Sequence, residues 1–102
     1  MIAAPEHHRV ILENDHVRVI ETLIQPGERT AVHTHCWSGA LVIMSWTDFI
    51  RYDDQDQVLF ESWTLEPRPT QGTVTWSGPL GPHYVHNVGT ENLHVIATEL
   101  KD

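Results

Sequence analysis

The residues that could do chemistry are histidines in two short segments of the chain. His33 and His35 are separated by a single residue and follow Pro26-Gly27, a pair that ends one strand and redirects the chain into the next. In an extended strand alternate side chains point to the same face, so these two imidazoles project together, about 6–7 Å apart along the strand. Two imidazoles placed in this way can converge on one metal ion. Eight histidines in 102 residues make a His-x-His pair alone a weak signal.

The second segment spans residues 79–89 and reads Pro-Leu-Gly-Pro-His-Tyr-Val-His-Asn-Val-Gly. His83 and Asn87 are four residues apart and share a strand face. His86 is three residues from His83, so on a regular strand it points to the opposite face. Only one of His83 and His86 can therefore join His33 and His35, and strand parity does not say which.

Together the two segments resemble the paired motifs of the cupin family of small β-barrels. Gly27, five residues and then His33-x-His35 match the first motif, while His83, followed by Asn87 and soon by Gly89, matches the second. The resemblance extends over roughly residues 13–100. It implies a jelly-roll barrel in which His83 is the third ligand of a metal ion bound by His33 and His35.

The chain departs from the cupin pattern at one ligand position. In metal-binding cupins three or four residues usually separate the second histidine of the first motif from a Glu, and at those positions after His35 this chain has Gly39 and Ala40. The second motif is also one residue short before His83. Three neutral imidazoles with open positions still suit zinc, and they also accommodate iron, nickel or copper. Some cupin dioxygenases that resemble this arrangement manage with three histidines. The alternative is a metal-free polar interior in which hydrogen bonds satisfy the imidazoles.

For the other polar and aromatic residues we expect structural roles rather than roles in the site. We expect Asn87 to stabilise the turn into Gly89, and Cys36 to be an incidental thiol. The tryptophans are first of all core and interface residues, although Trp37, two residues beyond His35, could form a wall of a pocket mouth. Five further histidines are expected outside the site, at the surface, in turns or at an interface: His7, His8, His16, His86 and His94.

Short strands separated by turn residues must position these groups. No apolar spacing of three and four residues persists over a dozen positions, so helix is a minor element. We predict nine strands, near residues 9–13, 17–24, 30–35, 40–47, 49–52, 58–65, 72–76, 83–87 and 93–100. Their rhythm predicts an all-β fold, a single cupin-like jelly-roll β-barrel over residues 1–102 whose closure hides the strand edges.

Composition excludes several classes of partner. The formal charge of −8 and the pI near 5.3 argue against nucleic acid and against an anionic membrane. No signal peptide is visible at the N-terminus, and no apolar stretch approaches the ~18 residues of a membrane span. The single cysteine is compatible with a reducing compartment, so we expect a cytoplasmic protein.

The expected function is that of a metal-binding protein acting on a small molecule, as an oxygenase or isomerase with open coordination positions. This choice of reaction comes from the resemblance to cupins, and the motifs contain no general base besides the ligands themselves. The alternative is a metal-free module that binds or senses a small molecule. A homodimer is also expected, because Val10-Ile11-Leu12 and residues 93–97 are more apolar than strands at an uncovered sheet edge should be.

Overall fold

A computed structural model describes residues 6–101, whose regular structure is almost entirely β-strand. The nine strands are β1 His8–Glu13, β2 Val17–Ile24, β3 His33–His35, β4 Gly39–Ser45, β5 Phe49–Asp53, β6 Val58–Glu61, β7 Val74–Ser77, β8 Leu80–Asn87 and β9 Leu93–Leu100. All nine predicted strands are present. β2 and β9 begin and end at the predicted residues, whereas the others differ by up to four residues at one end or by one or two residues at both ends.

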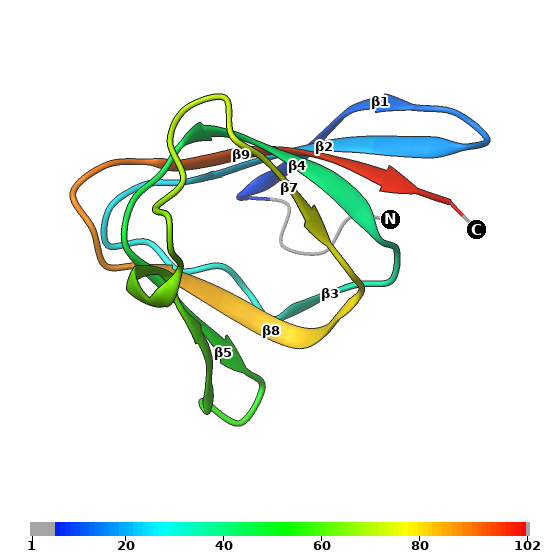
Figure 1. Cartoon of the computed structure of the whole chain (residues 1–102). Coiled ribbons are helices and arrows are strands. Elements are labelled where there is room, and N and C mark those ends of the chain that lie inside the picture. Colours follow the sequence, from blue (N-terminus) through cyan, green and yellow to red (C-terminus); the bar gives the residue numbers. More distant parts are fainter. Residues whose placement is uncertain (1–5, 102) are drawn as a thin grey trace.

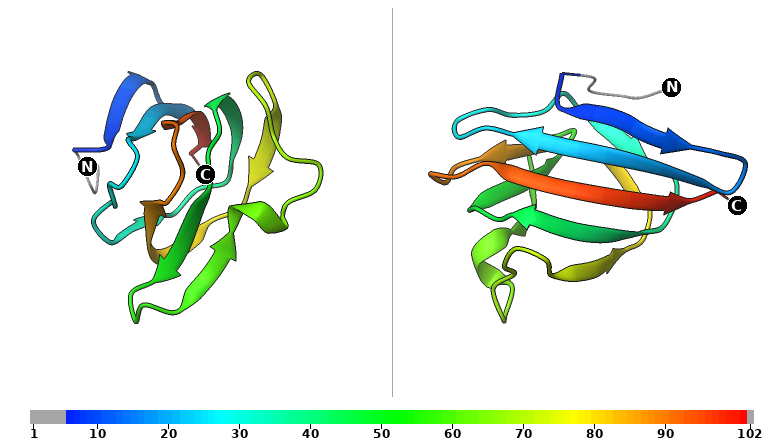
Figure 2. Two further views of the ribbon diagram at one scale, coloured as in Figure 1. Left: turned by 90° about the vertical axis from the view of Figure 1, so that its left-hand side faces the viewer. Right: turned by 90° about the horizontal axis from the view of Figure 1, so that it is seen from above.

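The strands form two antiparallel sheets that face each other (Figure 1). The order is β1-β2-β9-β4-β7 in the larger sheet and β3-β8-β5-β6 in the smaller. Views from the side and from above show the sheets curving around a common interior (Figure 2). This arrangement confirms the predicted all-β jelly roll.

The predicted closure of the barrel is not observed. Within residues 6–101, β7 pairs only with β4 and β3 pairs only with β8, so no ladder of hydrogen bonds joins the two sheets. The edge strands β3 and β7 contain three and four residues, respectively, which limits the backbone that either could offer to a further partner. Strand edges therefore remain uncovered, contrary to the expectation that closure hides them.

The hydrophobic core fills one end of the space between the sheets. Ile24, Phe49, Val85 and Leu93 form a buried cluster, and three partly buried apolar residues pack against it: Trp46, Phe60 and Val95. Val, Ile, Phe and Trp at alternate strand positions place these side chains on the inner faces of the sheets. The opposite end of the same space is left to polar residues.

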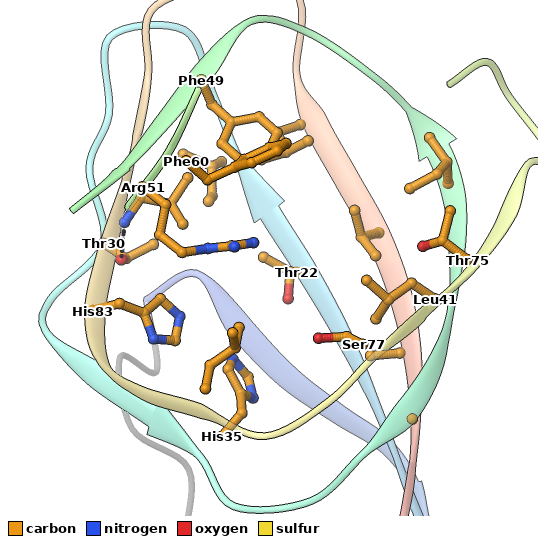
Figure 3. A pocket seen from close by; sticks show the side chains of 18 of the residues that line it. Thr22, Thr30, His35, Leu41, Phe49, Arg51, Phe60, Thr75, Ser77 and His83 are labelled. Carbon is orange, nitrogen blue, oxygen red and sulfur yellow. Dashed lines mark hydrogen bonds between the residues drawn. The ribbon is translucent and has the colours of Figure 1, made fainter. Parts of the chain in front are cut away.

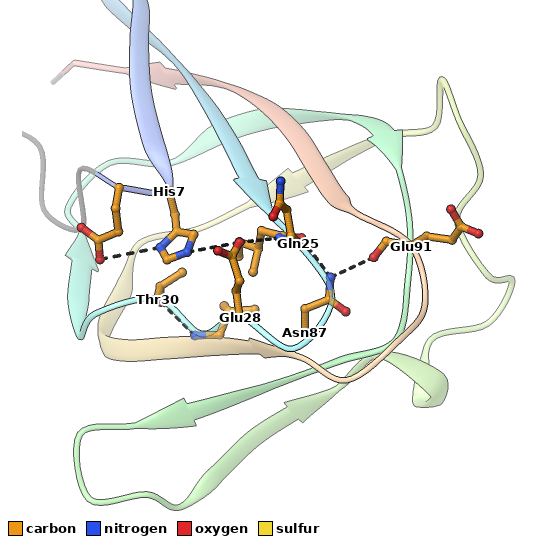
Figure 4. A network of polar contacts seen from close by, with 9 residues as sticks. His7, Gln25, Glu28, Thr30, Asn87 and Glu91 are labelled. Carbon is orange, nitrogen blue, oxygen red and sulfur yellow. Dashed lines mark hydrogen bonds and ion pairs between the residues drawn. The ribbon is translucent and has the colours of Figure 1, made fainter.

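Asn87 anchors the turn at the apolar end, as predicted. Its side chain is fully buried, and its Nδ2 donates hydrogen bonds to the carbonyl oxygens of Ile24 and Glu91, both at 2.9 Å (Figure 4). Its Oδ1 accepts a hydrogen bond from the Gly89 backbone. A buried amide with three such bonds fixes the path of the chain from β8 into β9.

No helix among the described residues is long and apolar enough to cross a membrane. Ser62–Thr64, one turn of 3-10 helix, follows β6 where strand was predicted to continue.

Candidate metal centre

A cavity of about 350 Å³ lies between the two sheets. Its lining has two chemically distinct ends, with the rings of Phe49 and Phe60 at one end and the imidazoles of His35 and His83 at the other (Figure 3). The volume falls in the range of small-molecule sites, which are mostly apolar with a few placed polar groups.

Strand register brings the three predicted histidines together in this cavity. His33 on β3 lies directly opposite His83 on β8, and their ring centroids are 4.3 Å apart. A bulge follows His33, yet His35 still faces the cavity, with its ring centroid 5.1 Å from that of His33 and 5.4 Å from that of His83. The three residues predicted from their spacing and from the resemblance therefore form one cluster, while metal binding by them stays a prediction.

The pairing of β8 resolves the alternative between His83 and His86. His83 is 2 % exposed and lines the cavity. His86 lies opposite Ile50 of β5, forms a bridge with Arg29, and is not among the residues that line the cavity.

His8 belongs to the cluster, and the expectation that it is a surface residue was wrong. It is 8 % exposed, and its ring centroid lies 4.7 Å from that of His33 and 6.0 Å from that of His35. The reason is strand pairing, because His8 begins β1 opposite Thr22 of β2, whose side chain also faces the cavity. His8, His33 and His35 each offer one ring nitrogen, and the three nitrogens lie within 4.8 Å of one another, a group that does not include His83.

The neighbouring His7 points the other way and holds the start of β1 in place. Its side chain is 9 % exposed, and its Nε2 lies 3.6 Å from a carboxylate oxygen of Glu28, in the loop that leads to β3 (Figure 4). The same oxygen accepts a hydrogen bond from the Gln25 backbone. This contact ties β1 to the loop before the first motif.

Sequence alone could not show that His8 faces inward, because the pairing of β1 with β2 decides it.

Hydrogen bonds at Nδ1 set the orientation of the three predicted ligands. The Nδ1 of His33 donates to the carbonyl oxygen of Ala31 at 2.8 Å, and that of His83 donates to the carbonyl oxygen of Gly81 at 2.7 Å. A carbonyl can only accept, so Nδ1 carries the hydrogen and Nε2 carries the lone pair in both rings. Metal-ligating histidines are commonly held in this way, with the second ring nitrogen fixed by a carbonyl or carboxylate.

Burial keeps two of these imidazoles neutral. It lowers the pKa of His33 to about 3 and that of His83 to about 4, against the opposing effect of the hydrogen bonds to Ala31 and Gly81. The other histidines of the cluster add a smaller effect in the same direction. A neutral imidazole is the form that binds a metal ion.

Glu99 of β9 supplies a carboxylate next to the cluster that the motifs did not predict. It is 3 % exposed, and its Oε2 lies 3.1 Å from the Nδ1 of His35, while its Oε1 accepts hydrogen bonds from Arg18. Burial raises the pKa of Glu99, but the hydrogen bonds from His35 and Arg18 outweigh burial and lower it overall. The ionised carboxylate therefore orients His35 in the same way that the carbonyls orient the other two rings.

Register explains why this carboxylate arises from β9. Gly39 lies directly opposite Glu99 in the β4–β9 ladder. A Cβ atom at position 39 would clash with the carbonyl oxygen of Thr98 and lie 3.0 Å from the Cα atom of Glu99. A glutamate at position 39, one of the places where the cupin motif would have it, is therefore not compatible with this backbone.

The donor set fits a divalent transition metal ion. Four imidazole rings lie close together, and two of them are held neutral by burial. The Nδ1 atoms of His33, His35 and His83 are engaged in hydrogen bonds, which leaves Nε2 of these three rings as the donor. Four nitrogen ligands at 2.0–2.1 Å from a tetrahedral ion stand about 3.4 Å apart, so the nitrogens of His8, His33 and His35 need only a small inward movement.

Comparison with known proteins supports the fold. No protein-family model matches the chain, and no curated protein matches it in sequence. A cupin domain from Bordetella pertussis has a similar structure, with a TM-score of 0.73 and 21 % identity over 93 % of this chain and 92 % of that one. An RmlC-like cupin with a double-stranded β-helix fold from Methanocaldococcus jannaschii gives a TM-score of 0.63 and 11 % identity over 91 % and 77 %.

An enzyme is also among the similar structures. The polyketide cyclase RemF from Streptomyces resistomycificus has a TM-score of 0.58 and 15 % identity, over 93 % of this chain and 64 % of that one. At these identities the likeness is one of fold. The chain therefore has the cupin fold, a double-stranded β-helix, as its sequence motifs predicted.

Proposed function

We propose that the protein binds one divalent transition metal ion through His33, His35 and His83 and uses it on a small molecule held in the cavity. His8 lies where it can serve as a fourth donor. The observation that carries this proposal is the clustering of imidazole rings whose Nδ1 atoms are already engaged in hydrogen bonds, which leaves Nε2 of each ring as the free donor.

The chemistry proposed is of the oxygenase or isomerase type. When bound, a zinc, iron, nickel or copper ion acts as a Lewis acid or activates water or oxygen. The protein's own contribution is to hold neutral imidazoles in place and to exclude bulk water with the apolar end of the cavity. Glu99 is engaged by His35 and Arg18, so its role is to position His35 rather than to transfer a proton.

The second candidate is a metal-free module that binds or senses a small molecule. The apolar half of the cavity favours it, because Ile24, Phe49 and Leu93 offer a surface for an apolar ligand without any metal. The site of action proposed for either function is the cytoplasm, since Cys36 is an exposed free thiol compatible with a reducing compartment.

Metal binding by single-histidine variants separates the two functions. Protein purified without a nickel column or chelator is analysed for metals, stripped, and titrated with Zn²⁺ by calorimetry. We expect one ion per chain and a loss of affinity of at least about tenfold in His33→Ala, His35→Ala and His83→Ala. His8→Ala tests the fourth donor, and the exposed His16→Ala is the matched control, expected to bind as the wild type does. Folding of each variant is verified by circular dichroism.

Two results would contradict the metal-binding proposal. One is the absence of any metal in the purified protein together with no heat of binding. The other is an affinity that the three folded variants share with the wild type, because the ion would then lie elsewhere. The first result would favour the metal-free binding module, whereas the second would show that the ion binds outside the histidine cluster.

A further inference from the structure

Arg51 places a positive charge inside the cavity, between its apolar end and the histidines. It lies on β5 directly opposite Phe60 of β6 and Val85 of β8. His83 is two residues from Val85 on the same strand face, so Arg51 and His83 are diagonal neighbours, roughly 7–8 Å apart. Figure 3 shows the Arg51 side chain reaching from the wall towards the middle of the cavity.

No protein group neutralises this guanidinium among residues 6–101. Arg9, Arg18 and Arg68 each pair with a carboxylate, but no carboxylate of the described chain forms an ion pair with Arg51. Its Nε is buried and has no hydrogen-bond partner. The guanidinium lies over the ring of Phe60, whose centroid is 5.4 Å from the guanidinium carbon.

A partly buried cation of this kind costs stability unless something offsets it. Burial lowers the pKa of Arg51 from its ordinary value, which reflects that cost. The contact with the Phe60 ring offsets only part of it. Such a residue is expected where a ligand supplies the missing negative charge.

The charged residues that line the cavity do not supply this negative charge to Arg51. Among residues 6–101, Glu99 is the one acidic residue that lines the cavity, and its two oxygens are engaged by His35 and Arg18. Although the whole chain carries a formal charge of −8, the inside of the cavity holds a cation with no anion assigned to it. An anionic ligand would therefore supply the counter-charge that Arg51 lacks.

We propose that Arg51 binds the carboxylate of a small organic acid whose apolar part packs against Phe49 and Phe60. The planar guanidinium matches a carboxylate in a two-pronged hydrogen-bonded pair. One unpaired cation in a mostly apolar cavity suits a monoanion better than a phosphate dianion, which would keep an uncompensated buried charge. That this acid is the substrate rests on the proposed function, since the histidine cluster lies next to Arg51.

The size of the cavity limits the acid. At about 30 Å³ for each water-sized group, 350 Å³ holds roughly twelve such groups. A monocarboxylate of about ten non-hydrogen atoms therefore fits. Suitable probes are benzoate, hexanoate and 3-phenylpropionate, each with its neutral amide as a partner of nearly the same shape, and acetate as a carboxylate without an apolar body.

The test uses metal-free protein, so that binding to an ion cannot replace binding to Arg51. Each acid and amide is titrated into the wild type, Arg51→Met and Arg9→Met by calorimetry and by nuclear magnetic resonance. We expect at least one larger acid to bind at least about tenfold more tightly than its amide and than acetate. That preference should disappear in Arg51→Met and persist in Arg9→Met, in which an exposed arginine is removed.

Denaturation gives a second measurement that does not depend on affinity alone. Arg51→Met removes a partly buried charge that has no ion-pair partner and keeps an unbranched chain, so its denaturation midpoint should equal or exceed that of the wild type. The preferred acid should raise the midpoint of the wild type and leave that of the variant unchanged.

Three outcomes would overturn the inference. The first is equal binding of acids and amides, and the second is retention of the preference for acids in Arg51→Met. The third is a denaturation midpoint of Arg51→Met below that of the wild type, combined with no acid that raises the midpoint of the wild type. This third result would make Arg51 a structural residue. Zinc titration of the same samples distinguishes failure of the proposed metal site from failure of the proposed role of Arg51. Acid binding without zinc binding would refute only the proposed metal site, and zinc binding without acid binding would refute only the role of Arg51.

Discussion

At the scale of single residues, the ring of His35 differs from those of His33 and His83 in the group that accepts the hydrogen bond from its Nδ1 atom. Glu99, itself paired with Arg18, takes the place of a backbone carbonyl. Removing this carboxylate would leave the Nδ1 of His35 without its acceptor and the ring free to turn. Outer groups of this kind typically contribute 10–100-fold to metal affinity.

We therefore expect Glu99→Ala to weaken zinc binding by about 10–100-fold and Glu99→Gln, which keeps an acceptor oxygen, to weaken it less. Glu21→Ala is the matched control, because Glu21 also pairs with an arginine and a histidine, Arg9 and His94, outside the cavity. Calorimetric titration with Zn²⁺ measures the effect. Equal losses in the Glu99 and Glu21 variants would show that positioning of His35 does not matter.

The two histidines with lowered pKa values predict how stability depends on pH. In the unfolded chain both rings take up protons near pH 6.5, whereas in the folded metal-free protein they stay neutral down to about pH 4 and about pH 3. The unfolded state then binds more protons over this interval, so the stability of the fold decreases as the pH falls below about 6.5.

Between pH 7.5 and pH 5 these two groups together should lower the free energy of unfolding by up to about 4 kcal/mol in metal-free protein. Urea denaturation at the two pH values measures the change. His33→Asn should remove about half of the dependence, whereas His16→Asn, an exposed position, should leave it intact. A stability that is the same at both pH values would show that the rings are not buried as neutral groups.

The residues of the site differ in how far the sequence could predict them. His33, His35 and His83 follow from spacing on strands and from the resemblance to cupins. His8 and Glu99 belong to no motif, because the pairing of β1 with β2 and of β9 with β4 places them. The sequence does not distinguish Arg51 from other strand residues, because only the pairing of β5 with β6 and β8 shows that it faces the cavity.

At the scale of elements, the close approach of β4 and β9 governs the site. The two backbones meet at Gly39, opposite Glu99, with no room for a side chain on β4. The strands themselves were predictable, because turn residues separate short segments rich in β-branched and aromatic residues. Their arrangement into two unclosed sheets was not, since it depends on pairings between strands far apart in the sequence.

We predict that Gly39→Ala lowers the free energy of unfolding by about 1–3 kcal/mol, because the new methyl group overlaps the Thr98 carbonyl. It should also weaken zinc binding by displacing Glu99. Gly78→Ala is the control, since an added Cβ there meets no atom within 4 Å. Chemical denaturation of both variants provides the comparison, and similar stabilities for the two would refute the close approach.

At the scale of the whole molecule, the uncovered sheet edges bear on assembly. The apolar segment at residues 93–97 is not at an edge, because β9 pairs with both β2 and β4, so that part of the reason for expecting a dimer was wrong. β1 does form an edge, and its Ile11 and Leu12 are 46 % and 52 % exposed. An apolar edge of this kind tends to pair with another chain.

We still predict a homodimer that pairs through β1. Light scattering at micromolar concentration should give a mass near twice 11.7 kDa, and Leu12→Lys should shift it towards the mass of one chain. Val58→Lys, at another exposed apolar position, should leave the mass unchanged. A wild-type mass near 11.7 kDa would exclude the dimer.

Whether the imidazoles of the cavity bind a metal ion decides the proposed function. X-ray absorption spectroscopy of zinc-loaded protein tests it most directly, because it counts the ligands around the ion and identifies imidazole rings by their outer atoms. We predict nitrogen or oxygen donors at about 2.0–2.1 Å with the outer scattering of at least three imidazoles, which His33→Ala should reduce by one ring. A sulfur donor at about 2.3 Å, which would place the ion at Cys36, or a shell with fewer than two imidazoles would contradict the claim.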